Sequence, residues 1–206
     1  MKIKTLAAMC KREGAFCLYD RVDSNGEVMG QWLGTTAAVY PLSGVPYLTE
    51  ENLAALFDIT EKQAEKIRFT HAPLPAGINF DDTDKAEAIL DREKMTLGYG
   101  ARIVRPLFTR GGLEFIDNDF LSPLADVADV LELFERRTLE GQTYFAAKVG
   151  LLIVGVFMPL SIIETKFVEN METMAANCRA ALNVKIEREA RREKERGEQT
   201  SIDGEE

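Results

Sequence analysis

Histidine and cysteine are scarce in this chain of 206 residues, which limits the chemistry that it can perform. The single histidine, His71, lies between Thr70 and Ala72, outside any catalytic motif. A histidine–carboxylate or serine–histidine system would have to use this one residue, so we interpret His71 as a structural or surface residue. The sequence predicts no catalytic residue, no cofactor and no enzymatic activity.

The three cysteines, Cys10, Cys17 and Cys178, form no CxxC pair and leave an odd count. This pattern is typical of reduced thiols rather than of a disulfide framework. The N-terminus does not resemble a signal peptide, and we therefore expect a cytoplasmic protein.

Long hydrophobic runs are also lacking. The most apolar uncharged run, residues 149–163, covers 15 residues and contains two glycines and a proline. A transmembrane helix needs about 20 consecutive, mostly apolar residues. We therefore expect a soluble protein that makes no membrane contact.

Positive charge is in deficit, since the net charge is −9 and residues 1–184 alone carry −7. An acidic surface repels phosphate and is atypical of general nucleic-acid binding. The arginines that do cluster either grip phosphate or a partner's carboxylates, or form a solvated rim balanced by Glu132, Glu135 and Glu140. We predict the following partner-binding residues: Arg102, Arg105, Arg110, Arg136, Arg137, Arg188, Arg191 and Arg192.

Four oxygen-bearing side chains, Asn79, Asp81, Asp82 and Asp84, lie close enough in sequence to suggest a cation site. A calcium loop that began at Asp82 would need glycine at its sixth position, where Glu87 stands. Capping of a short helix by Asp84 explains the cluster better. We predict no metal site.

What the sequence does contain is an alternation of short apolar runs and turn residues, such as Asn25-Gly26, a strong hairpin signal. This alternation predicts an α+β fold with a mostly antiparallel sheet in two similar subdomains, followed by a long C-terminal helix. Strands are expected at 15–22, 27–33, 37–40, 67–70, 95–99, 103–108, 113–116, 142–147 and 151–157. Helices are expected at 5–13, 50–57, 60–66, 84–90, 123–134 and 165–196.

The two halves share an order of strands, a Pro-Leu pair and an amphipathic helix, which suggests a duplication. We predict the following division of the chain: an N-terminal α+β subdomain (1–75), a linker (76–90), a C-terminal α+β subdomain (91–164), a C-terminal helix (165–196) and a disordered acidic tail (197–206).

The C-terminal helix changes character along its length. An apolar stripe formed by Phe167, Met171, Met174, Cys178 and Leu182 predicts one buried helix face. From 185 to 196, ten of the twelve residues are charged, and the stripe disappears. A helix without an apolar face is either solvated or held by a partner. We expect this charged stretch to be a contact arm for a protein partner, and the helix to offer a route to a homo-oligomer.

Three segments, Gly30-Gln-Trp-Leu-Gly34, Val39-Tyr-Pro-Leu42 and Tyr144-Phe-Ala-Ala-Lys148, carry a resemblance that extends over the whole chain. The chain resembles a group of uncharacterised proteins from prophages and mobile elements of anaerobic gut bacteria. This resemblance implies a role between an element and its host, where non-catalytic inhibitors of CRISPR or restriction nucleases are common.

Two shorter motifs, Phe120-Leu121 and Phe157-Met158-Pro159-Leu160, are similar to signatures of bacterial DNA sliding clamps. Clamp helices carry lysine and arginine toward DNA. The corresponding helices here instead carry the acids Glu50, Glu51, Asp126, Asp129 and Glu132.

We therefore expect a non-enzymatic, phage-type protein that binds a macromolecular partner and inhibits a host CRISPR or restriction nuclease. The alternative is a clamp-like accessory factor of DNA replication or recombination. Direct DNA contact is not the favoured expectation.

Overall fold

The computed structural model describes residues 1–91, 95–161 and 164–202, with side chains described as far as Glu193. The helices are α1 (Ile3–Glu13), α2 (Glu50–Leu56), α3 (Glu61–Ala64), the 3-10 helix η1 (Asn118–Val127) and α4 (Thr165–Ile202). The strands are β1 (Ala15–Val22), β2 (Val28–Gly34), β3 (Ala38–Leu42), β4 (Arg68–Pro73), β5 (Ala88–Ile89), β6 (Leu97–Tyr99), β7 (Arg102–Thr109), β8 (Gly112–Asp117), β9 (Leu131–Arg137), β10 (Thr143–Val149) and β11 (Leu152–Phe157). The predicted α+β class is confirmed.

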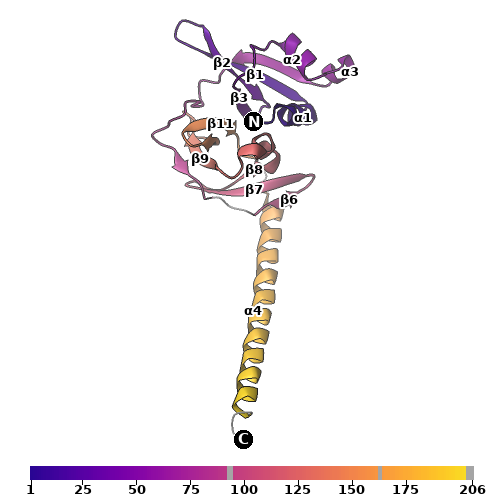
Figure 1. Ribbon diagram of the computed structural model, residues 1–206, viewed down its shortest axis with the longest axis vertical. Coiled ribbons are helices and arrows are strands. Elements are labelled where there is room, and N and C mark those ends of the chain that lie inside the picture. Colours follow the sequence, from indigo (N-terminus) through magenta and orange to yellow (C-terminus); the bar gives the residue numbers. More distant parts are fainter. Residues whose placement is uncertain (92–94, 162–163, 203–206) are drawn as a thin grey trace. The chain divides into compact units, whose positions relative to one another are not determined.

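The larger sheet contains eight strands in the order β4-β1-β2-β3-β11-β10-β9-β5, and β6, β7 and β8 form a second sheet (Figure 1). Every pair in the larger sheet is antiparallel except β1 with β4. Local hydrogen bonds stabilise the turn of the β1–β2 hairpin. The carboxylate of Asp23 accepts from the backbone N–H groups of Asn25 and Glu27, and Gly26 adopts a φ of 84°. The predicted mostly antiparallel sheet is confirmed.

The two predicted subdomains are joined in one sheet. β3 pairs with β11 through Val39 with Val156 and Ala38 with Phe157. The chain divides instead into two compact units, Met1–Ser161 and Ile162–Glu206. The boundary predicted at 76–90 is therefore corrected, since strand pairing between the halves makes them one body.

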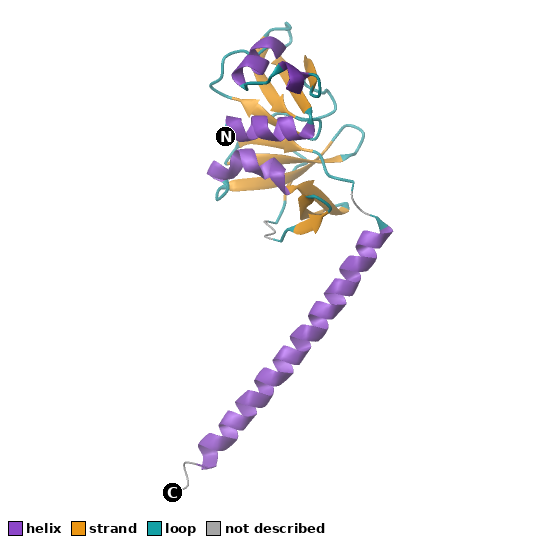
Figure 2. Ribbon diagram, turned by 90° about the vertical axis from the view of Figure 1, so that its right-hand side faces the viewer, coloured by secondary structure: helices purple, strands orange, loops and turns teal. Residues whose placement is uncertain are grey.

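Both faces of the larger sheet are buried, each in its own cluster. On one face, side chains such as Leu33 and Phe157 meet α1 and η1, which lie together across the strands (Figure 2). On the other face, Trp32 and Tyr144 are covered by the loop that carries Phe80, whose ring centroid lies 4.9 Å from that of Trp32. The segment predicted to be a linker thus supplies part of the core.

Two predicted helices are wrong. The segment 84–90 forms turns and the short strand β5, because the Asp84 carboxylate accepts from the backbone N–H of Ala86 and β5 pairs with β9. The segment 123–134 is divided between η1 and β9. Its apolar residues fit a helical spacing, but β9 gains a full ladder of pairs with β10. Tertiary pairing outweighs local spacing at such positions.

The unit Ile162–Glu206 contains α4, a continuous helix of 38 residues. The predicted long C-terminal helix is confirmed, although it continues six residues beyond the expected end at 196. Glu, Lys and Arg are good helix formers, so a charged sequence can extend a helix without an apolar face. Of the predicted disordered tail, 197–202 are helical and 203–206 lie outside the described residues.

Candidate interaction surfaces

The arginines of β7 are positioned by side-chain oxygen atoms of neighbouring elements. Arg102 donates to Asp117 at 2.6 Å and to Glu13 at 3.0 Å, and these hydrogen bonds raise the pKa of its guanidinium. Arg105 donates to the side-chain oxygen of Asn118 at 3.1 Å. Arg102 remains 43% exposed, so its outer edge can still meet a partner.

Arg110 and Arg137 converge on one buried carboxylate, Glu135. The backbone N–H of Arg110 donates to Glu135 at 2.8 Å, and the Arg137 guanidinium donates to its other oxygen at 3.3 Å. Burial alone would raise the pKa of Glu135, but these donors and their charges hold it below its ordinary value. Both arginines keep about half of their side-chain surface, at 50% and 45% exposure.

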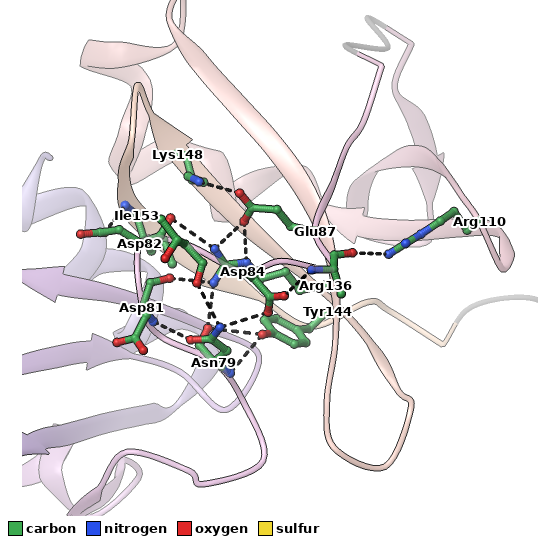
Figure 3. Close-up of polar contacts among 12 residues, drawn as sticks. Asn79, Asp81, Asp82, Asp84, Glu87, Arg110, Arg136, Tyr144, Lys148 and Ile153 are labelled. Atoms are coloured by element: carbon green, nitrogen blue, oxygen red, sulfur yellow. Dashed lines mark hydrogen bonds and ion pairs between the residues drawn. The ribbon is translucent and has the colours of Figure 1, made fainter.

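Arg136 is fully buried, so the prediction that it binds a partner is wrong. Its guanidinium donates to the backbone carbonyls of Asn79, Asp81 and Asp82 and to the Glu87 carboxylate (Figure 3). Alternation along β9 explains the difference from Arg137, because successive strand residues point to opposite faces. Arg136 therefore anchors the loop that covers the sheet.

The same network contains Lys148, which is 4% exposed and donates to Glu87 at 2.8 Å. Partial burial alone would raise the pKa of Glu87, but the hydrogen bonds from Lys148 and Arg136 keep it below its ordinary value. Asp82 accepts from the backbone N–H of Ile153 at 2.9 Å. In the same acid cluster, Asp84 accepts from the backbone N–H of Ala86 at 2.8 Å and Asp81 accepts from Arg21 at 2.6 Å.

His71 lies at the edge of the larger sheet, on β4. Its Nε2 lies 2.8 Å from the Asp20 carboxylate, which also accepts from Gln31 at 2.8 Å and from the Tyr47 hydroxyl at 3.3 Å. Among the described residues, Asp20 is the one side chain that hydrogen-bonds to the His71 imidazole. This geometry holds the imidazole in place on β4, and no Ser, Thr or Cys side chain in the described part of the chain bonds to it.

One groove in the unit Met1–Ser161 has a volume of about 610 Å³. Its apolar wall includes Leu107, Leu121 and Leu131, contributed by β7, η1 and β9. The exposed carboxylates that line it are Asp91, Asp129 and Glu132, while Arg105 also contributes to the lining. An apolar wall with an acidic margin suits a partner segment that is both apolar and basic.

The described side chains of α4 are mostly exposed. Only Phe167 and Met171 are half-buried, whereas Met174 is 51% and Leu182 55% exposed. Arg188, Arg191 and Arg192 are all exposed. Lys185 and Glu189 form an i, i+4 pair at 3.8 Å. The helix therefore presents an uncovered apolar stripe followed by an uncovered charged segment.

No protein-family model, no curated protein and no solved structure matches this chain. Among the described residues, no group of three His, Cys, Asp or Glu side chains is arranged to hold a metal ion. Within the same ranges, no helix has the length and apolar character needed to span a membrane.

Proposed function

We propose that this protein is a non-enzymatic, phage-type protein that binds a bacterial nucleic-acid enzyme, of the CRISPR or restriction nuclease class, and inhibits it. The observation that carries the proposal is the exposed helix α4. Its charged segment from 185 onward has six cations and four anions within twelve residues and no apolar stripe. Such a segment is stabilised little by itself and more by a partner with complementary charge.

The charge of the remaining chain supports the choice of a nucleic-acid enzyme as the partner. Residues 1–184 carry a net charge of −7, the same sign as nucleic acid. Exposed acids lie on α2 and α3 and at the end of α3, among them Glu50, Glu51, Glu61 and Glu65. A nuclease groove that attracts phosphate would attract this surface as well, and occupation of that groove would exclude substrate.

The proposal is tested by interference assays in bacteria that carry a defined CRISPR or restriction system. The chain is expressed before challenge with a phage that the system normally restricts, and phage plating is measured. Inhibition predicts that plating rises toward the level of a host without the nuclease. Unchanged plating against representatives of both classes, with the folded protein present in the cells, would refute the proposal.

Binding to the inhibited nuclease is then compared between two sets of substitutions. Arg188→Ala, Arg191→Ala and Arg192→Ala together should weaken binding about tenfold, since each exposed charge contact contributes up to about 1 kcal/mol. The matched control replaces three exposed cations of the other unit, Lys62, Lys66 and Arg68, by alanine. Equal losses in both sets would show that net charge alone, and not α4, carries the contact.

A DNA mobility-shift assay at low salt examines the clamp-like alternative directly. The proposed inhibitor does not retard DNA on its own, because its surface is acidic. Retardation of DNA by the isolated protein would instead favour the replication or recombination accessory factor.

A further inference from the structure

One row of small and apolar side chains along α4 has a regular spacing. Met171, Ala175, Cys178 and Leu182 follow one another at spacings of four, three and four residues along a continuous helix. This is the a/d spacing that forms the seam of a two-helix pair. Ala175, Cys178 and Leu182 are exposed and Met171 is half-buried, so the seam is open to a partner.

We propose that α4 pairs with the α4 of a second copy of this chain, in antiparallel orientation, through this seam. In this register Met171 packs against the partner's Leu182, and Ala175 packs against the partner's Cys178. The two-fold axis repeats both contacts. The small side chains lie at the centre and the larger ones at the ends, so the two helices can approach closely along the seam.

Charge next to the seam favours the antiparallel orientation. Glu172 and Arg179 are both exposed and flank the seam on the same side. Antiparallel pairing places Glu172 beside the partner's Arg179, and symmetry places Arg179 beside the partner's Glu172. A parallel pair would place each of these side chains beside an apolar residue and form neither ion pair.

The charged segment of α4 gives a second reason to expect the antiparallel orientation. If the seam spacing continues beyond Leu182, it reaches Lys185, Glu189 and Arg192. A parallel pair in register would set each of these charges opposite its own copy, which destabilises the pair. In the antiparallel register the helices overlap over residues 165–188, roughly 36 Å at 1.5 Å per residue. Residues beyond 188 then extend past the partner's Thr165.

This inference goes beyond the proposed function and does not depend on it, because it concerns the protein alone. A dimer of this kind would carry two charged segments that leave the paired region in opposite directions. Substitutions that abolish pairing need not abolish nuclease binding, and the two properties are measured in separate experiments.

The test is disulfide trapping between two single-cysteine helices of the full chain. Both variants carry Cys178→Ala; one adds Met171→Cys and the other adds Leu182→Cys. Cys10 and Cys17 are buried, and burial raises the pKa of Cys10 to about 12, so neither competes under mild oxidation. The two variants are mixed, oxidised and examined by non-reducing gel electrophoresis.

Antiparallel pairing predicts a crosslinked dimer after mixing and almost none from either variant alone. Positions 171 and 182 of one helix are about 16 Å apart, too far for a disulfide between identical positions of an antiparallel pair. The control replaces Met171→Cys by Ala176→Cys, on the opposite helix face. Mixing should crosslink at least about tenfold faster than this control, because pairing raises the effective thiol concentration.

Two results would overturn the inference. Crosslinking of each variant with itself, at the rate seen on mixing, would demonstrate a parallel pair. Crosslinking no faster than the Ala176→Cys control in every combination would show that this stripe does not hold two copies together.

Discussion

Replacing Glu87 by glutamine removes one negative charge from between two buried cations. In the wild-type protein one carboxylate oxygen accepts from Arg136 at 2.9 Å and the other accepts from Lys148 at 2.8 Å. A glutamine amide offers one acceptor oxygen, and its NH₂ group would face the second cation. Breaking a buried ion pair costs about 3–5 kcal/mol, because the remaining charge is desolvated without compensation.

This loss is large beside a total stability of about 5–15 kcal/mol for a typical protein. We expect the Glu87→Gln variant to fold at pH 7 but to melt about 6–20 °C below the wild type, using 2–4 °C per kcal/mol for a chain of this size. Urea unfolding followed by circular dichroism measures the free energy directly. The control is Glu140→Gln, which removes an exposed carboxylate from a turn and should change stability by less than about 0.5 kcal/mol.

The pH dependence of the stability difference between wild type and Glu87→Gln gives an independent check. The folded-state pKa of Glu87 is lowered from 4.5, so its contribution to stability is present above that value and is lost as pH falls through the folded pKa. The stability difference between wild type and Glu87→Gln should therefore shrink at low pH. A difference below about 1 kcal/mol at pH 7, or one that is equally large in strong acid, would refute the assignment of a charge-dependent core network.

Four further changes have defined outcomes. Gly34→Ala should lower the free energy of unfolding in urea by about 1–3 kcal/mol or more, because the added Cβ would lie 1.9 Å from the Ala38 carbonyl oxygen. Its control, Gly30→Ala on the same strand, adds a Cβ in open space and should be nearly neutral. Ile153→Ala should cost about 2–5 kcal/mol by the same measurement, and a loss under about 1 kcal/mol would contradict its burial. Truncation after Val184 should shift the melting temperature by less than about 2 °C, and unfolding of the truncated chain would show that the charged segment packs on the protein. His71→Ala should leave nuclease inhibition within about threefold of wild type, and a hundredfold loss would reveal a direct functional role.

The elements that the sequence predicts well are those whose signals are local. Gly14 ends α1 in a left-handed conformation with a φ of 65°, and Thr49 caps α2 through a reciprocal bond with Asn52. Such motifs depend on residues within four positions of each other. They identify where an element begins or ends without reference to the rest of the fold.

β9 and the joined sheet depend instead on partners distant in sequence. The spacing of Leu124, Ala128, Leu131 and Phe134 is compatible with a helix, but Phe134 pairs with Ala146 of β10. The junction between the halves rests on a few residues of β3 and β11, for which the sequence gives no short-range signal. A resemblance between halves could not distinguish two bodies from one sheet, because both arrangements use the same strands.

The arginines illustrate the same limit for the candidate surface. Arg136 and Arg137 are adjacent in sequence, yet one is fully buried and the other 45% exposed. Lys148, which follows two alanines within an apolar strand, is the sequence signal that points to a buried charge network. A charge at such a position needs a buried counter-charge, and Glu87 provides it.

The network also explains why a segment with the composition of a linker is part of the core. Residues 74–87 contain little regular structure, so their buried carbonyls need hydrogen-bond donors from elsewhere. Arg136 has five N–H donors in a fixed plane and supplies three carbonyls together with the Glu87 carboxylate. A hydrophobic side chain could fill the same volume but could not satisfy those carbonyls. The buried charge is therefore required by the loop that crosses the sheet, and it provides a structural reason for Arg136 that is independent of any partner.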